Sequence, residues 1–310
     1  MRDETIEMNI DKESGGGQMF RRTLKVECKK ALCNKLLLVV IIIGCAITMM
    51  SFVPMVRSYF DDIRQAELFA QESEFERNPL MGIESLFSHW IGSEAVTAGS
   101  VDYFFLLPLL AAIPYGWSYC VEKRSGYIRQ MITRAGSYHY YAAKYIATFL
   151  SGGLAVVLPL LFNFLLTAMF VPAILPDPYF MTTFGVISSS LLSELLYTSP
   201  FLYVFLYLMI DFFYGGMIAC LGMTVGMFVK NRVAVVILPF FALLGFDYIC
   251  RTFIYTSGQV IYTEYSPMHF LRPVADAYET NGYVVFIGAV ILVLLTALPL
   301  VTREAGHELY

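Results

Sequence analysis

The chain has 310 residues, of which 57% are hydrophobic and 15% charged, and its formal net charge is −4. This composition is typical of polytopic membrane proteins. The length suits several membrane spans with their loops, which leaves no room for a soluble catalytic domain.

The first 17 residues are polar and end in Gly15–Gly17, which predicts a flexible cytoplasmic tail. No Lys-Ser/Thr pair follows these glycines, so they do not form a phosphate-binding loop. Residues 18–310 are predicted to form a single transmembrane domain.

An amphipathic helix is predicted from Met19 to Asn34. Such a helix lies in the membrane interface with its basic side toward anionic lipid. The alternative is a plain stop-transfer flank of basic residues. The helix would combine apolar and basic residues, namely Phe20, Leu24, Cys28, Ala31 and Leu32 with Arg22, Lys25 and Lys29.

Six apolar stretches predict six transmembrane helices and hence an all-α polytopic fold. The first starts about 35 residues into the chain and is too long for a cleaved signal, so it is predicted to be a retained signal anchor that ends at Pro54. The second contains Pro108 and Pro114, which neighbouring helices must accommodate. The predicted spans cover about 36–54, 102–121, 145–171, 200–229, 233–250 and 282–301.

The segments between these spans differ in charge. An acidic insertion at about 55–100 is predicted to lie outside, with a helix near 61–76 and with Trp90 and Ile91 dipping into the outer interface. Segment 172–199 has no Lys or Arg and is also assigned outside, packed on the membrane surface. Segment 251–281 is rich in Tyr and Pro.

The distribution of basic residues sets the orientation. With the N-terminus inside, the inner segments hold sixteen Lys and Arg and the outer segments five. Both termini are therefore predicted to be cytoplasmic. A seventh span at 180–198 would place Lys230 and Arg232 outside, and we reject it.

The stretch from Cys120 to Lys144 is basic and lies between two apolar runs. On a helix that starts at Gly126, the apolar side chains of Tyr127, Ile128, Met131, Ile132 and Ala135 share one side, and Arg129, Gln130, Thr133 and Arg134 share the other. Such a helix is suited to docking into a cytoplasmic partner. The alternative is an ordinary positive-inside loop on lipid headgroups.

The order of residues in this stretch resembles the first cytoplasmic loop of type-2 ATP-binding-cassette (ABC) transporter permeases. The resemblance rests on Glu122, Ser125-Gly126, Thr133-Arg134, Tyr140-Tyr141 and Lys144, and the six-span layout extends it over nearly the whole chain. In that family the helix of this loop is a coupling helix, which sits in a groove of a separate ATPase subunit.

The resemblance implies further features. Residues 19–34 would be the elbow helix before span 1, and residues between spans 5 and 6 would form re-entrant outer helices. Glu122 would belong to the hinge between span 2 and the coupling helix; the alternative is a solvated interfacial acid. The implied ATPase-coupling residues are Glu122, Arg124, Gly126, Tyr127, Ile128, Arg129, Met131, Ile132, Thr133 and Arg134.

Two acids fall inside predicted spans. Asp211 either lines the translocation path or lies at the outer end of a tilted span 4. Asp247 is one helical turn before Arg251 and is predicted to form an ion pair with it. Gly222 and Gly226 have the GxxxG spacing, which predicts close helix packing or a dimer seam.

The chain shows no catalytic motif. The four histidines are far apart, HExxH and GxSxG are absent, and the six cysteines include no CxxC. No catalytic, cofactor or metal residue is therefore assigned. The chain has no Walker A motif, so the resemblance to ABC permeases implies that ATP and Mg²⁺ bind to a partner ATPase.

The sequence thus predicts a non-enzymatic permease subunit in a plasma membrane, such as a bacterial inner membrane. Its expected partners are an ABC ATPase, a second permease copy or relative, and lipid, with no nucleic acid. The resemblance favours export of a peptide, lipophilic compound or lipid. The acidic insertion would suit a cationic peptide, as would any solvated loop. The alternatives are an ion-gradient-driven secondary transporter, or a membrane sensor or assembly protein that does not transport.

Overall fold

The structure, a computed structural model, describes residues 2–72, 84–176, 186, 189–255, 263–274 and 278–307. The regular secondary structure of this part of the chain is helical apart from one isolated β-bridge between Thr263 and Glu279. Five of its helices are long and apolar enough to cross a membrane, so the chain has the build of an all-α multi-pass membrane protein. The elements are α1 (Arg2–Leu32), α2 (Lys35–Glu72), α3 (Leu86–His89), α4 (Ala98–Ala112), α5 (Ser118–Arg124), α6 (Tyr127–Ala135), α7 (Ser137–Thr167), α8 (Ser193–Thr198), α9 (Pro200–Phe228), α10 (Arg232–Ile249), the π-helix η1 (Cys250–Ile254), α11 (Pro267–Phe270) and α12 (Gly282–His307).

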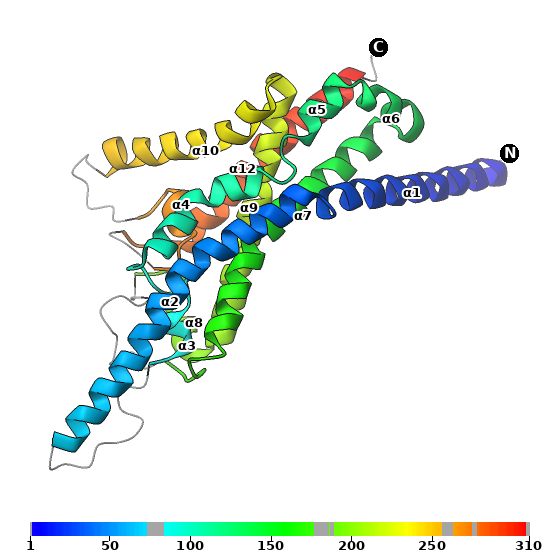
Figure 1. The fold of residues 1–310 in the computed structure, drawn as a ribbon. Helices are drawn as coiled ribbons and strands as arrows, with labels where there is room; N and C mark the ends of the chain where they lie inside the picture. The colour runs from blue at the N-terminus through cyan, green and yellow to red at the C-terminus, as the bar shows by residue number, and fades with distance from the viewer. Residues whose placement is uncertain are drawn as a thin grey trace.

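Helices α7 and α9 form the centre of the bundle (Figure 1). Their backbones approach closely because small residues face each other. A Cβ atom added to Gly152 would lie 2.4 Å from Ala219 Cβ and 2.7 Å from the carbonyl oxygen of Gly215. Small residues let membrane helices make extensive van der Waals contact, which replaces the hydrophobic driving force that lipid removes.

The predicted second span is not one continuous helix. Helix α4 ends at Ala112, a turn follows, and α5 starts at Ser118. Pro114 has no N–H to donate to a helical hydrogen bond, and its carbonyl accepts a hydrogen bond of 2.8 Å from Asn34 Nδ2. The span predicted over about 102–121 therefore consists of two helices, with Pro108 inside α4 and the break at Pro114.

The GxxxG pair of α9 supports this break. The Cβ position of Gly222 lies 3.5 Å from Gly116 Cα in the turn, and that of Gly226 lies 3.5 Å from Cys120 Cβ in α5. The predicted packing role is therefore confirmed, and it operates within the chain.

Helix α1 extends away from the other helices toward the N-terminus (Figure 1). It begins at Arg2 and not at Met19, so the structure places most of the predicted flexible tail in the same helix. Glycine weakens a helix by about 1 kcal/mol per residue relative to alanine without removing a hydrogen bond, and Gly15–Gly17 accordingly do not interrupt it.

Helix α2 continues through Pro54 to Glu72, which corrects the prediction that Pro54 ends span 1. A proline removes one hydrogen bond of the helix. Beyond it, Val56 and Tyr59 are buried in the core and hold the next turns in place. The helix predicted near 61–76 is the distal end of α2 as far as Glu72; residues 73–76 lie outside the described residues.

Residues 84–97 enter the bundle at the end remote from α6. Trp90 and Ile91 of this segment are fully buried inside the bundle, so the prediction that they dip into the outer membrane interface was wrong. Asn163 of α7 fixes this segment, because its Oδ1 accepts from Ile91 N at 3.0 Å and its Nδ2 donates to Thr48 O at 3.0 Å. The buried amide thus satisfies a backbone N–H of this segment and a backbone carbonyl of α2, and it holds the segment inside the bundle.

The segment before α9 also packs inward. Leu191 and Leu196 are buried in the core, so these two leucines do not lie on the membrane surface. Residues 177–185 and 187–188 of the same predicted outer segment lie outside the described residues. In the predicted re-entrant region, η1 and α11 are the helical elements that the structure describes.

Candidate functional site

Helix α6 is a short helix bounded by two glycines. Gly126 has φ 75° and Gly136 has φ 81°, a left-handed range in which side chains other than glycine are strained. These two residues let the chain leave α5, form nine residues of helix and turn into α7. The helix predicted from Gly126 is therefore present.

The two sides of α6 differ as the sequence predicts. Ile128 and Ala135 are buried, and Tyr127, Met131 and Ile132 are half-buried. The exposed residues on the opposite side are Arg129, Gln130, Thr133 and Arg134. An exposed, basic helix surface is thus backed by an anchored apolar one.

The apolar side of α6 contacts several helices at once. Ile128 belongs to a buried cluster, and Met131 and Ile132 pack against it. This cluster draws its other members from four helices, namely Tyr119 of α5, Tyr140 and Tyr141 of α7, Met223 and Met227 of α9, and Leu300 of α12. A displacement of α6 would therefore press on four helices together.

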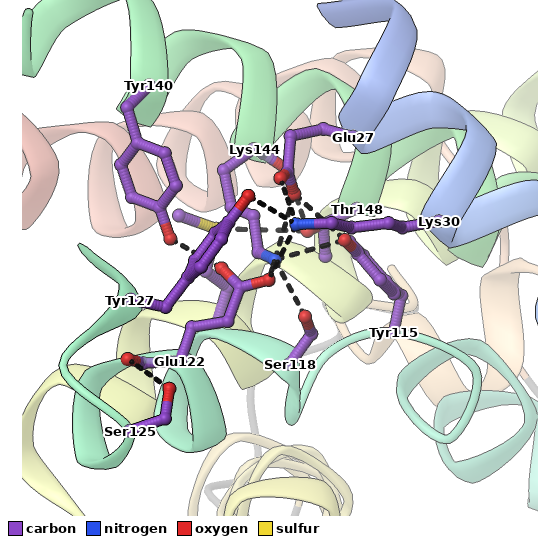
Figure 2. Close-up of polar contacts among 11 residues, drawn as sticks. Glu27, Lys30, Tyr115, Ser118, Glu122, Ser125, Tyr127, Tyr140, Lys144 and Thr148 are labelled. Atoms are coloured by element: carbon purple, nitrogen blue, oxygen red, sulfur yellow. Dashed lines mark hydrogen bonds and ion pairs between the residues drawn. The ribbon is translucent and has the colours of Figure 1, made fainter. Parts of the chain in front are cut away.

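Beside this apolar cluster lies a group of charges, which we call the lysine–glutamate cluster: the buried Glu27 and the partly exposed Lys30 of α1, the half-buried Glu122 of α5, and the buried Lys144 of α7. Figure 2 shows these four side chains converging with their tyrosine and serine partners. The two lysines and two glutamates balance in charge. Helix α1 supplies one charge of each sign, α5 supplies an acid and α7 a base, so each charge meets an opposite one.

Lys144 is the centre of this cluster and is fully buried. Its Nζ lies 3.0 Å from Glu27 Oε2 and 2.9 Å from Glu122 Oε1. It also donates to Ser118 Oγ at 2.7 Å and to the Tyr115 hydroxyl at 3.0 Å. Two carboxylates and two hydroxyls thus replace the water that a buried ammonium has lost.

The break in the second predicted span supplies part of this site. Tyr115 lies in the turn between α4 and α5, and its hydroxyl donates to Glu27 Oε2 at 2.9 Å. Ser118 is the first residue of α5. A continuous helix would point these two side chains in other directions, so the break places both of them in contact with Lys144.

Lys30 joins the charges to α6. Its Nζ lies 2.8 Å from Glu27 Oε1, 3.4 Å from Glu122 Oε1 and 2.9 Å from the Tyr127 hydroxyl. The ammonium also lies 4.1 Å from the centre of the Tyr127 ring, a cation–π contact. Helices α1 and α6 are therefore in direct polar contact.

Glu122 connects the remaining helices. Besides its ion pairs with Lys144 and Lys30, Glu122 accepts a hydrogen bond of 2.6 Å from the Tyr140 hydroxyl of α7. Its side chain is 14% exposed, so it is an ion-paired acid and not the solvated interfacial acid of the alternative interpretation. A bend at Glu122 would disturb α1 and α7 together.

Burial and charge act in opposite directions on the groups of α1. Burial raises the pKa of Glu27, but the charge of Lys144 and hydrogen bonds from Lys30 and Lys144 outweigh it, so the pKa is lowered. Burial lowers the pKa of Lys30, whereas hydrogen bonds with Glu27 and Tyr127 and the Glu122 charge raise it overall. Both residues are therefore charged at neutral pH.

The observed burial agrees only in part with the apolar and basic sides that the sequence predicts for the elbow helix. Phe20 and Leu24 are half-buried, and the exposed basic residues are Arg22, Lys25 and Lys29. The fully buried stripe, however, is Thr23, Glu27 and Ala31. The side of α1 that contacts α7 is thus centred on an acid.

Asp211 is buried deep in α9, and its Oδ1 has no hydrogen-bond partner among the described residues. The hydroxyls of Tyr207 and Tyr203, one and two turns earlier, are also buried without a partner there. The structure therefore places Asp211 inside the bundle of a single chain and not at the outer end of α9. It lies apart from the lysine–glutamate cluster.

Asp247 forms the predicted ion pair, with its Oδ2 3.1 Å from Arg251 Nε. Its Oδ1 also lies 3.2 Å from His269 Nε2, so the pair ties the end of α10 to α11. Among the described residues, no group of three His, Cys, Asp or Glu side chains could hold a metal ion.

Sequence reasoning missed four members of the site: Glu27, Lys30, Tyr115 and Ser118. One signal was available, because Glu27 falls between Leu24 and Ala31 on the apolar side of the predicted elbow helix. An acid in such a position needs a buried partner. Lys144 was included in the family resemblance, but nothing in the sequence indicated its burial.

The chain was compared with family models, curated proteins and solved structures, and none matches it.

Proposed function

We propose that this chain is the permease subunit of an ABC transporter, driven by a separate ATPase that binds α6. The observation that carries the proposal is the lysine–glutamate cluster. Through Lys30, Tyr127 and Glu122 it joins a short exposed helix to α1, α5 and α7. A force applied to α6 would reach all of these helices without passing through a flexible loop.

The proposed topology has six spans. Helices α4 and α5 with their connecting turn form the second, since their 15 and 7 helical residues at about 1.5 Å each cover roughly 33 Å, enough for a bilayer core of about 30 Å. Both termini and α6 are cytoplasmic, in agreement with the positions of lysine and arginine. In this topology α1 is the elbow helix, and residues 84–97 close the outer end of the bundle.

In the proposed mechanism, two permeases pair with two ATPases in a plasma membrane of the bacterial inner-membrane kind. ATP-driven closure of the ATPases moves α6, and the two permeases shift between inward-open and outward-open states. The substrate, a peptide, a lipophilic compound or a lipid, is exported between the two permeases. The chain itself performs no chemistry, and its charges transmit force.

The test is to purify the chain with a candidate ATPase from the same cell and to measure Mg-ATP hydrolysis. Replacing Arg129, Gln130 and Thr133 with alanine alters the exposed side of α6 only, and hydrolysis by the complex is expected to fall at least 5-fold. Arg64→Ala, exposed at the far end of α2, is the matched control and should leave hydrolysis unchanged.

A second candidate is an ion-gradient-driven transporter. Asp211 favours it, because its buried Oδ1 has no hydrogen-bond partner among the described residues and intramembrane acids often bind transported ions. The two functions give opposite results. Transport that needs a proton or sodium gradient, is abolished by Asp211→Asn and proceeds without any ATPase would replace the ABC proposal.

A further inference from the structure

A basic pocket lies where α5 ends and where α9 turns into α10. It has a volume of about 370 Å³ and is lined by Arg124, Lys230, Asn231, Arg232 and Val233. It therefore contains three cationic side chains and no acidic one.

The pocket has a fixed frame. Arg124 Nη1 donates to the carbonyl oxygen of Lys230 at 3.4 Å, and Lys123 Nζ donates to Met227 O at 2.8 Å. Cys120 Sγ lies 3.2 Å from the same Lys230 carbonyl. These contacts hold the end of α5 against the turn, so the positive charges stay together.

The charges of the pocket are not neutralised within the described part of the chain. Among the described residues, no acid forms an ion pair with Arg124, Lys230 or Arg232. Three like charges around one pocket repel one another, and an anion between them removes the repulsion. Arginine and lysine together favour the oxygens of a phosphate group.

Apolar surface adjoins the pocket. Phe228 is 71% exposed at the end of α9, two residues before Lys230, and Val233, which lines the pocket, is exposed at the start of α10. Further along α10, Leu238 and Phe241 are also exposed. A free phosphate ion would not use this surface, whereas an acyl chain attached to a phosphate would lie along it.

We propose that the pocket binds the phosphate of an anionic phospholipid, whose acyl chains lie against the exposed side of α10. The site is separate from the lysine–glutamate cluster and requires only that α9 and α10 span a membrane. It does not depend on the ATPase partner. The lipid would fix the turn between α9 and α10 against the end of α5.

The test measures lipid retained by the purified full chain in detergent by native mass spectrometry, during titration with phosphatidylglycerol or phosphatidylcholine. The pocket variant is K230Q/R232Q, which leaves Arg124 and its frame contact in place. The matched control is R129Q/R134Q, which removes the same charge from the exposed side of α6.

We expect wild type and R129Q/R134Q to retain one phosphatidylglycerol in preference to phosphatidylcholine. K230Q/R232Q should bind it about 30-fold more weakly, the effect of two basic side chains near a membrane surface. Equal binding by K230Q/R232Q and wild type, or equal retention of the two lipids, would overturn the proposal. So would release of the lipid by millimolar inorganic phosphate, because the pocket would then be a site for soluble anions.

Discussion

Lys144 Nζ lies 3.0 Å from Glu27 Oε2, and both side chains are fully buried although 117 positions separate them in the chain. This ion pair joins the long N-terminal helix α1 to the central helix α7. Removing one partner of a buried pair leaves a charge that neither water nor protein neutralises. The pair therefore gives the first test of the site.

Lys144→Met is expected to destabilise the protein by about 3–5 kcal/mol, because it leaves Glu27 and Glu122 close together without the central ammonium. The measurement is thermal unfolding of the purified chain in detergent. Lys30→Met, at a residue whose side chain is 36% exposed, should cost less. The double variant K144M/E27Q should recover part of the loss, and no recovery would contradict the pairing.

The pH dependence of stability should report the same pair. The pKa of Glu27 in the folded chain lies below its ordinary value of about 4.5, so the unfolded chain binds more protons as the pH falls below this value. The contribution of Glu27 is therefore present above pH 4.5 and is lost as the pH falls through the lower pKa. Wild type should lose more thermal stability than Glu27→Gln between pH 6 and pH 3.5; parallel curves would be inconsistent with a charged Glu27.

The approach of α7 to α9 gives a third prediction. Gly152→Ala would place its Cβ 2.4 Å from Ala219 Cβ and 2.7 Å from a backbone oxygen, so the helices must separate and the melting temperature should fall by several degrees. Gly245→Ala in α10 meets no atom within 4 Å and serves as the control. If both variants melt at the same temperature, the close contact of α7 with α9 is not important for stability.

A fourth prediction concerns transmission from α6. Tyr127→Phe removes the hydroxyl that Lys30 contacts at 2.9 Å and keeps the ring. Folding should be retained, because one hydrogen bond to a charged group contributes about 1.5–3 kcal/mol. In the complex with the ATPase, adding substrate should change the rate of ATP hydrolysis less for this variant than for wild type. An unchanged response would show that force does not pass through Lys30.

Local patterns in the sequence predicted much of the fold. Apolar length identified the helices that could span a membrane, and the alternation of basic and apolar residues identified α6 and its two sides. These features depend on residues three or four positions apart, which a helix brings together whatever surrounds it. The Asp247–Arg251 pair is predictable for the same reason.

The rest depends on contacts between distant segments. Neither Glu27 nor Lys144 indicates from its neighbours which partner it will meet, since the partner lies on another helix. Prolines were equally ambiguous: the chain breaks near Pro114, where Asn34 and the α9 glycines accommodate the turn, and continues through Pro54, where core packing holds the helix. Tertiary contacts decide between these outcomes.

The most direct test of α6 as a coupling helix is to locate the surface of the chain that an ATPase contacts. Gln130, exposed on α6, is replaced by a photo-crosslinking amino acid in membranes that contain the candidate ATPase. Tyr283, 80% exposed at the start of α12, is the control at the opposite end of the bundle. We predict an ATPase crosslink from position 130 and none from position 283. Crosslinking from position 283 alone, or labelling of position 130 by an impermeant reagent from outside the cell, would contradict the account.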